Sequence, residues 1–205
     1  LYISPITGGT ELANEINTNL AFISHDYNVP MCLGSGRAAL EDNELLESFQ
    51  IRGIAPNSLI FANLGAVQLN YGYGIDECRK LVDMMKADGL VLHINPLQEA
   101  IQPDGDTNFS CLIEKINKLV SGFEKPIIVK EVGHGISGVV AKKLEQAGVS
   151  CIDVAGAGGT SWSAVEGYRN DDDLGNTFKE IGIPTAESLI QAKASTQLPI
   201  IASGG

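Results

Sequence analysis

The chain has 205 residues, of which 44% are hydrophobic and 19% are charged, as is typical of a globular protein with a well-buried core. Its formal net charge of −11 argues against nucleic acid as a partner, because non-specific binding to nucleic acid needs a basic surface. No apolar run approaches the roughly 18 residues that cross a bilayer, so we expect no membrane partner. The cysteines are interpreted as reduced core thiols, from which we expect a cytoplasmic location. The four cysteines form no CxxC pair, which argues against a structural zinc site.

Strand-like and helix-like segments alternate from the first residue to the last. Short apolar segments rich in β-branched residues predict strands at residues 1–6, 29–33, 59–64, 89–94, 126–132, 150–155 and 198–202. Apolar residues at helical spacing predict helices at residues 10–28, 37–50, 75–86, 109–120, 137–147 and 185–194. In the first of these helices the predicted apolar face is Leu12, Ile16, Leu20 and Ile23. Residues 95–108 and 156–176 are predicted to be long loops.

This alternation predicts an α/β fold built from parallel βα units. The strands are continuously apolar, as expected where helices cover both faces of a sheet. A (β/α)8 TIM barrel and an open doubly wound sheet both fit this pattern, and seven predicted strands favour the barrel. A complete barrel needs about 250 residues. We therefore expect residues 1–205 to be a single but incomplete barrel domain, a fragment that lacks the last βα unit and an N-terminal extension.

The carboxyl ends of the strands carry the chemistry in such a barrel. Each predicted strand of this chain is followed by glycine or by polar residues, which a purely structural barrel would not require at every strand. These ends are residues 7–9, 34–37, 63, 93–95, 130–131, 156–160 and 203–205. The pattern therefore predicts a binding site formed by the ends of successive strands.

Two glycine clusters follow the sixth and seventh predicted strands, at residues 156–159 and 204–205. Glycine lets backbone N–H groups approach a phosphate closely. The alternative is that these glycines only form tight turns between strand and helix. Two adjacent clusters, with the Thr160 and Ser203 hydroxyls beside them, favour phosphate binding.

Two further signals point to an anionic ligand. Lys130 ends an apolar strand, where its charge needs an anionic partner such as the N1–C2=O edge of a flavin. Gln98 and Glu99 follow the fourth predicted strand. Glu99 is suited to hold Mg²⁺ against a diphosphate, and Gln98 is a neutral amide that can hydrogen-bond a substrate. The alternative for Glu99 is a solvated position on a polar surface loop.

Taken in order, these motifs resemble those of type 2 isopentenyl-diphosphate isomerase, the FMN-dependent kind. The specific parts are HxNxxQE at residues 93–99 and GGTSWxxVExYR at residues 158–169. The motifs TGG, GSxR, KE and SGG, at the ends of other strands, support them. The likeness covers essentially the whole chain. It implies interconversion of isopentenyl and dimethylallyl diphosphate, an isoprenoid diphosphate as the small-molecule partner, and a homo-oligomer, tetrameric or octameric.

The resemblance also implies roles for single residues. FMN would contact Thr7, Gly8, Ser35, Asn63, Lys130, Thr160, Gly204 and Gly205. The substrate would contact Ser35, Arg37 and Gln98, Mg²⁺ would bind Glu99, and the catalytic group would be Gln98, His93 and Asn95. Enzymes of this family need reduced FMN, with NADPH as the usual reductant, although their reaction involves no net redox change.

The chain departs from the family pattern at Ile6, where methionine is usual, and at Gly36, where glutamine is usual. Two other functions stay open. One is a different FMN-dependent barrel enzyme, such as a 2-hydroxy acid oxidase or dehydrogenase. That chemistry needs a catalytic His–Arg pair near the seventh strand, and no histidine follows His134. The other is a fragment without catalytic activity.

Overall fold

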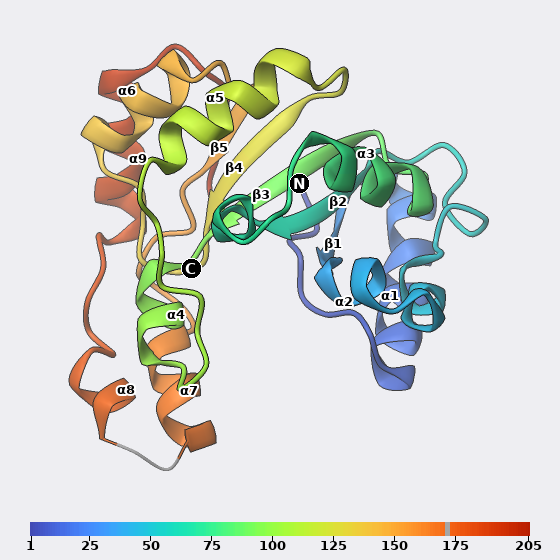
Figure 1. Cartoon of the computed structure of the whole chain (residues 1–205), viewed down its shortest axis with the longest axis horizontal. Coiled ribbons are helices and arrows are strands. Elements are labelled where there is room, and N and C mark those ends of the chain that lie inside the picture. The colour runs from blue at the N-terminus through green and yellow to red at the C-terminus, as the bar shows by residue number, and fades with distance from the viewer. Residues whose placement is uncertain (171–172) are drawn as a thin grey trace. The chain divides into compact units, whose positions relative to one another are not determined.

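The computed structural model describes residues 1–170 and 173–205, in which helices alternate with six strands (Figure 1). The strands are hydrogen-bonded in chain order, and the pairs β1–β2, β4–β5 and β5–β6 are parallel. Their bounds are β1 (Met31–Ser35), β2 (Ile60–Gly65), β3 (Gly89–Ile94), β4 (Ile127–Glu131), β5 (Cys151–Asp153) and β6 (Ile200–Ile201). The predicted α/β fold with a parallel sheet is therefore confirmed.

Nine α-helices and two 3-10 helices lie within the described residues. The α-helices are α1 (Glu11–Tyr27), α2 (Arg37–Glu41), α3 (Ile75–Met84), α4 (Pro96–Ile101), α5 (Leu112–Gly122), α6 (Gly138–Gln146), α7 (Trp162–Asn170), α8 (Leu174–Thr177) and α9 (Thr185–Ser195). The 3-10 helices are η1 (Asn43–Phe49) and η2 (Ala66–Asn70). None of the helices formed by residues 1–170 and 173–205 combines the length and the apolar character needed to span a membrane.

The chain divides into two compact units, and the prediction of one domain stays a prediction. Unit 1 consists of residues 1–65, 73–92 and 122–127. Its core is formed by buried side chains of β1 and β2, such as Leu33 and Leu64, together with Phe49 of η1. Helix α1 packs against η1 and β1, and α2 packs against α3.

Unit 2 consists of residues 66–72, 93–121 and 128–205. Its strands β4 and β5 pair in register, with Val129 opposite Ile152 and Lys130 opposite Asp153. Helix α6 packs against α9, and α7 packs against both α4 and α8. This packing joins α4, which follows β3, to α7, which follows β5.

The first predicted strand is wrong, because residues 1–6 form only a single β-bridge between Ile3 and Met31. The Ile3 N–H donates to the Pro30 carbonyl, and the Ile3 carbonyl accepts from the Cys32 N–H. Two residues later the chain reaches Pro5, which has no N–H to continue the ladder. The described residues therefore contain six strands where seven were predicted.

The predicted apolar face of α1 is also wrong. Leu12 and Ile23 are 66% and 48% exposed. The buried side chains of this helix are Ala13, Asn17, Ala21 and Ser24. Small residues at a spacing of three to four let the helix approach its neighbours closely, and this stripe decides which face is buried. The ends of α1 agree with the sequence, since the Thr10 hydroxyl caps it by accepting from the Ala13 N–H at 3.1 Å.

The predicted helix at residues 37–50 is divided at Asp42 into α2 and η1. The Asp42 carboxylate accepts a hydrogen bond from the Glu44 N–H at 2.9 Å. A short polar side chain that bonds to the backbone in this way competes with helix continuation. The residue therefore ends α2 and begins η1.

Both predicted long loops contain helices. Helix α4 lies within residues 95–108 and begins at Pro96, a residue well suited to the first helical position. Helix α7 lies within residues 156–176, and α8 begins within them; residues 171–172 fall outside the described residues. The Ser161 hydroxyl accepts from the Ala164 N–H at 3.4 Å, as a capping residue does. Gln98 and Glu99 thus project from a helix and not from a loop.

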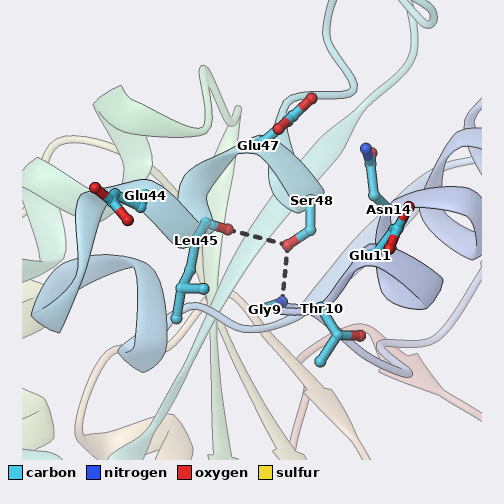
Figure 2. A pocket seen from close by; sticks show the side chains of 8 residues that line it. All are labelled: Gly9, Thr10, Glu11, Asn14, Glu44, Leu45, Glu47 and Ser48. Carbon is cyan, nitrogen blue, oxygen red and sulfur yellow. Dashed lines mark hydrogen bonds between the residues drawn. The ribbon is translucent and has the colours of Figure 1, made fainter.

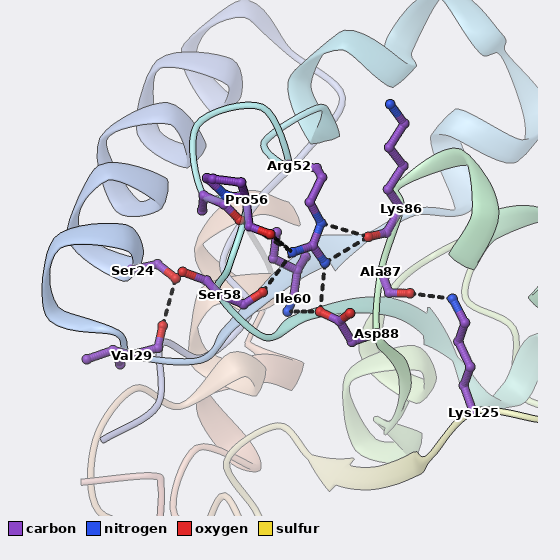
Figure 3. A network of polar contacts seen from close by, with 11 residues as sticks. Ser24, Val29, Arg52, Pro56, Ser58, Ile60, Lys86, Ala87, Asp88 and Lys125 are labelled. Carbon is purple, nitrogen blue, oxygen red and sulfur yellow. Dashed lines mark hydrogen bonds and ion pairs between the residues drawn. The ribbon is translucent and has the colours of Figure 1, made fainter.

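The amino ends of β2 and β3, in unit 1, are tied together by Arg52 (Figure 3). Its guanidinium donates to the carbonyl oxygens of Ser58 and Lys86, each at 2.8 Å, and to the Asp88 carboxylate at 2.7 Å. The same Asp88 oxygen accepts from the Ile60 N–H at 2.8 Å. This network holds together the segments that lead into β2 and β3. It lies at the amino ends of these strands, whereas the predicted site residues lie at the carboxyl ends.

Candidate functional site

In unit 1, the predicted residues gather at the carboxyl ends of β1 and β2. Ser35 ends β1 and is the Cα partner of Asn63 on β2. Thr7 lies against the same end of β1, because a Cβ on Gly34 would fall 2.4 Å from the Thr7 carbonyl oxygen. Glycine at position 34 is therefore required for this close approach. A Cβ on Gly8 would meet the Phe49 ring at 2.1 Å.

Two residues that sequence reasoning missed hold the TGG turn in place. Asn17 is only 2% exposed, and its side-chain NH₂ donates to the carbonyl oxygens of Thr7 at 3.2 Å and Ser48 at 2.8 Å. The Ser48 hydroxyl accepts from the Gly9 N–H at 2.7 Å and donates to the Leu45 carbonyl at 3.1 Å (Figure 2). The sequence feature that could have indicated this role of Asn17 is its place among small residues spaced three to four positions apart on α1.

A pocket of about 480 Å³ opens beside this turn (Figure 2). It is lined by Gly9, Thr10, Glu11, Asn14, Glu44, Leu45, Glu47 and Ser48. Three of these residues are glutamates, and their carboxylates repel an anion. The pocket therefore does not suit a diphosphate.

Arg37, the predicted diphosphate contact, begins α2 in the same unit. Its guanidinium donates to the Glu41 carboxylate at 2.8 Å, one helical turn along, and its side chain is 46% exposed. The Tyr73 hydroxyl donates to the same carboxylate at 2.9 Å. These two hydrogen bonds, that from Arg37 first, lower the pKa of Glu41. A bound diphosphate would compete with Glu41 for this arginine.

In unit 2, the HxNxxQE motif forms one hydrogen-bonded group. Asn95, at 3% exposure, donates from its side-chain NH₂ to Gln98 Oε1 at 3.2 Å and to Glu99 Oε1 at 2.8 Å. The second Glu99 oxygen accepts from the Asp106 N–H at 2.7 Å. The Asn95 Oδ1 atom is buried and has no hydrogen-bond partner in the described part of the chain. The motif thus fixes the orientation of Gln98 and Glu99 and leaves one acceptor unused.

Glu166 on α7 is a buried carboxylate that sequence reasoning placed only within a motif and gave no role. It is 2% exposed, and its Oε1 accepts from Gln98 Nε2 at 2.9 Å and from Gln102 Nε2 at 2.8 Å. Arg169, three residues later, lies 3.4 Å from the same oxygen. The Gln98 amide is therefore held at both ends, by Asn95 and by Glu166. The sequence feature that could have indicated this role is the spacing of Glu166 and Arg169, which places both side chains on one face of the helix within the motif GGTSWxxVExYR.

His93 and Lys130 interact electrostatically at the carboxyl ends of β3 and β4. Burial, followed by the Lys130 charge, lowers the pKa of His93 to about 4. The imidazole is therefore neutral at pH 7. Lys130 is 8% exposed, and its ammonium group donates to the Glu131 carbonyl oxygen.

Asp153 ends β5 and is fully buried. Its Oδ1 accepts from the Ser203 hydroxyl at 2.5 Å and from the Ala155 N–H at 3.3 Å. Its Oδ2 has no hydrogen-bond partner in the described ranges. Burial raises the pKa of this carboxyl, while the Ser203 hydrogen bond and the Lys130 charge act in the opposite direction.

The glycine clusters after β5 and β6 pack backbone against backbone. A Cβ on Gly204 would lie 2.1 Å from the Gly156 carbonyl oxygen, and one on Gly158 would lie 2.7 Å from that of Gly205. Gly204 also has a φ of +110°, which disfavours any other residue. Within residues 1–170 and 173–205, the N–H groups of Gly158, Gly159, Thr160 and Gly204 donate no hydrogen bond. Close packing explains the glycines, and the free N–H groups remain for a ligand.

A pocket of about 320 Å³ lies over the first of these clusters. It is lined by Gly133, Ala157, Gly158, Gly159, Thr160, Ser161, Lys179, Glu180, Ile181, Gly182 and Pro184. The free N–H groups of Gly158 and Thr160 belong to residues of this lining. The pocket is therefore suited to a small anionic group.

Glu131, the second residue of the KE motif, is used by the protein itself. Its Oε2 accepts from three successive backbone N–H groups, those of Val132 at 2.6 Å, Gly133 at 2.7 Å and His134. The His134 Nδ1 atom lies 3.4 Å from Glu131 Oε1. This carboxylate therefore shapes the turn after β4.

The predicted site residues thus form one group in unit 1 and two in unit 2. In unit 1 the structure brings together Thr7, Gly8, Ser35, Arg37 and Asn63 at the ends of β1 and β2. In unit 2 it brings together His93, Asn95, Gln98, Glu99 and Lys130, and likewise Thr160, Gly204 and Gly205. Their roles toward a cofactor, metal or substrate stay predictions.

The fold and these strand ends define a class of protein, an α/β protein of the TIM-barrel type with polar groups at the carboxyl ends of its strands. A solved structure, that of inosine 5′-monophosphate dehydrogenase from Legionella pneumophila, matches 95% of this chain and 48% of its own, with a TM-score of 0.53 and 16% identity. At that identity the likeness shows the fold alone. No family model matches the chain.

Relatives of known name point to a particular protein within this class. The chain is 54% identical to the isopentenyl-diphosphate delta-isomerase of Nostoc sp. over 210 residues, which is 100% of this chain and 60% of that protein. It is 53% identical to that of Synechocystis sp., over 99% of this chain and 60% of the relative. The enzyme of the same name from Oceanobacillus iheyensis is 48% identical, again over 60% of its length. The resemblance that the motifs predict is confirmed, and the chain spans about 60% of the length of these relatives.

Proposed function

We propose that this protein interconverts isopentenyl and dimethylallyl diphosphate with the help of FMN and Mg²⁺. The observation that carries the proposal is the fixed Gln98 amide, held by Asn95 at 3.2 Å and by Glu166 at 2.9 Å beside the Glu99 carboxylate. Relatives about 50% identical along the whole chain have the name of this enzyme, which supports the reaction. The substrate is then an isoprenoid diphosphate.

The residues of this chain fit FMN. The N–H groups of Gly158, Gly159, Thr160 and Gly204 donate no hydrogen bond among the described residues, and the absence of side chains at the glycines lets the two turns pack closely. These groups would hold the FMN phosphate. Lys130 would face the N1–C2=O edge, and Thr7, Gly8, Ser35, Asn63 and Gly205 would line the flavin. When bound and reduced, with NADPH as reductant, FMN supplies an electron-rich ring that exchanges protons and stabilises positive charge.

Glu99 fits Mg²⁺ as a single carboxylate ligand. Each of its oxygens accepts one hydrogen bond, from Asn95 and from the Asp106 N–H, and keeps a lone pair for a metal ion. Mg²⁺ is commonly bound by one or two carboxylates together with substrate phosphates. The metal would therefore bring the diphosphate next to Gln98.

His93 and Gln98 orient the substrate in this proposal. With a pKa of about 4, His93 is neutral at pH 7 and cannot serve as a cationic acid. Gln98 donates one N–H to Glu166 and keeps its second for the substrate. These neutral groups position the isoprenoid without removing a proton themselves. A homo-oligomeric state and a cytoplasmic location stay predictions.

The direct test is product analysis. The purified chain is mixed anaerobically with FMN, NADPH, Mg²⁺ and isopentenyl diphosphate, and dimethylallyl diphosphate is the expected product. Glu99→Gln is expected to raise KM about tenfold or more and to weaken the Mg²⁺ dependence, because the amide is a poorer ligand. Glu114→Gln, at an exposed position on α5, is the matched control. The proposal would be contradicted if the protein formed no dimethylallyl diphosphate and instead oxidised a 2-hydroxy acid. It would also be contradicted if Glu99→Gln changed neither KM nor the Mg²⁺ dependence.

A further inference from the structure

Asp153 has no role in the proposed reaction, yet it lies among the residues assigned to the flavin. It is the register partner of Lys130 across β4 and β5, so the two side chains leave neighbouring strands at the same level. On its other side, the Ser203 hydroxyl precedes Gly204 and donates to Asp153 Oδ1. The carboxyl group thus links the strand that carries Lys130 to the SGG turn.

The environment of Asp153 is unusual for a structural carboxylate. The side chain is 0% exposed, one oxygen has two donors, and Oδ2 has none in the described part of the molecule. A buried ionised group without full hydrogen bonding is costly, and an apolar residue at such a position is often no less stable. Retention of an ionisable carboxyl group here therefore calls for a function other than holding the strands together.

Lys130 is the positive group that Asp153 faces. Its ammonium donates to the Glu131 carbonyl, so the two charges interact through space and not through a direct hydrogen bond. Two other ionisable side chains lie near Lys130, and each is engaged differently from Asp153. His93 is neutral at pH 7, and Glu131 Oε2 is bonded to three backbone N–H groups. Asp153 is the buried carboxyl group that pairs in register with Lys130 and interacts with its charge.

We propose that Asp153 is a positioning residue of the flavin site, whose buried charge offsets that of Lys130 and limits the preference of the site for reduced over oxidised FMN. This inference rests on the proposed binding of FMN. An uncompensated ammonium group near the N1–C2=O edge favours reduced flavin, because that edge carries negative charge in the reduced form. A carboxylate on the adjacent strand opposes this effect without touching the cofactor.

The test is the midpoint potential of FMN bound to the chain. Asp153→Asn removes the charge and keeps the size and one acceptor oxygen. We expect its potential to be more positive than that of the unmodified protein by about 30 mV, which corresponds to a tenfold stronger preference for reduced FMN. Asp26→Asn, at an exposed position on α1, makes the same change in net charge and is expected to leave the potential unchanged.

A double-mutant cycle separates positioning from a merely structural role. Lys130→Gln removes the charge that favours the ionised form of the buried Asp153 side chain, so in this background Asp153→Asn is expected to shift the potential far less. If Asp153→Asn does not fold, Ser203→Ala is the second variant. It keeps the carboxyl group but removes a donor that favours its ionised form, so the potential at pH 6 is expected to move in the same direction by a smaller amount.

The outcomes distinguish this inference from the proposed function. An unmodified protein that fails to bind FMN, seen as an unchanged flavin absorbance spectrum, would overturn both. FMN binding with an unchanged or more negative potential in Asp153→Asn would overturn the inference and leave the proposed function standing. An equal shift with and without Lys130 would also overturn it, as would an unchanged potential in Ser203→Ala when that variant is used.

Discussion

At the amino ends of β2 and β3, Arg52 donates to four carbonyl groups and to the Asp88 carboxylate, which also accepts from the Ile60 N–H (Figure 3). At the carboxyl ends of β3 and β5, Asn95 Oδ1 and Asp153 Oδ2 are buried and have no partner among the described residues. One region satisfies its polar groups and the other leaves some of them unused. Unmade hydrogen bonds of this kind reduce stability, and they mark where a ligand would complete them.

The same contrast holds for other atoms of unit 2. Both ring nitrogens of His134 and the hydroxyl of Thr185 are buried without a hydrogen-bond partner in the described ranges. Each such atom costs roughly 1–3 kcal/mol relative to a satisfied one. Variants at the two kinds of region are therefore expected to change stability in opposite directions, and the following predictions test that difference.

The largest effect is expected from Arg52→Ala. The change leaves the carbonyl oxygens of Ser58 and Lys86 without their side-chain donor and the Asp88 carboxylate with only the Ile60 N–H, so the free energy of unfolding should fall by about 3–4 kcal/mol. Urea denaturation followed by circular dichroism measures this. Arg52→Lys keeps the charge but not the planar fork of donors, and it should lose an intermediate amount. If Arg52→Ala lowers the free energy of unfolding by less than about 1 kcal/mol, the hydrogen bonds around Arg52 do not stabilise the protein as proposed, and the two regions do not differ in this respect.

The next effect is a dependence of stability on pH through His93. Its pKa of about 4 in the folded state lies below the value of about 6.5 expected in the unfolded chain. The unfolded chain therefore binds more protons between these values, so stability is full above pH 6.5 and falls as the pH decreases to about 4. The lost stabilisation should be roughly 2–3 kcal/mol.

His93→Gln should remove this part of the pH dependence, because glutamine does not titrate. Unfolding free energies measured by urea at several pH values between 4 and 7 provide the comparison. The matched control is His25→Gln, at an exposed position on α1, which should leave the slope as it is. Equal slopes for the unmodified protein and His93→Gln would contradict the prediction.

The smallest effect is expected from Thr185→Val at the start of α9. The Thr185 hydroxyl is buried without a partner in the described residues, so a methyl group of the same shape removes a cost and should raise stability by about 0.5–1 kcal/mol. Thermal unfolding is a suitable measurement. Thr107→Val, at an exposed position, is the control and should be neutral. Destabilisation by Thr185→Val would show that the hydroxyl does have a structural role.

The order of the elements was predictable because it depends on local periodicity. The strands β2, β3 and β4 lie within one residue of their predicted bounds at nearly every end, since each is a continuous apolar run. The buried face of α1 was not predictable in this way. Ala13 and Asn17 are buried while Leu12 is exposed, because the approach of η1 selects small side chains, and that approach is a tertiary property.

The candidate site was predictable where a strand end carries the signal, as at Lys130 or Asn95. Residues that act from helices were harder to find. Glu166 is separated from Gln98 by 68 positions, and Asn17 from Ser48 by 31, so neither hydrogen bond has a local pattern. Asp153 lies inside the predicted apolar strand at residues 150–155, where the sequence alone does not show its neighbours. Only the pairing of β4 with β5 shows that the side chain lies beside Lys130.

The turn after β4 has a consequence for ligand selection. Three consecutive amide groups there converge on one point, and the chain fills that point with its own Glu131 carboxylate. A concavity of this kind is otherwise a receptor for phosphate. Because Glu131 occupies this turn internally, a phosphate group would have to use other N–H groups, such as those of Gly158, Gly159 and Thr160, which donate no hydrogen bond among the described residues.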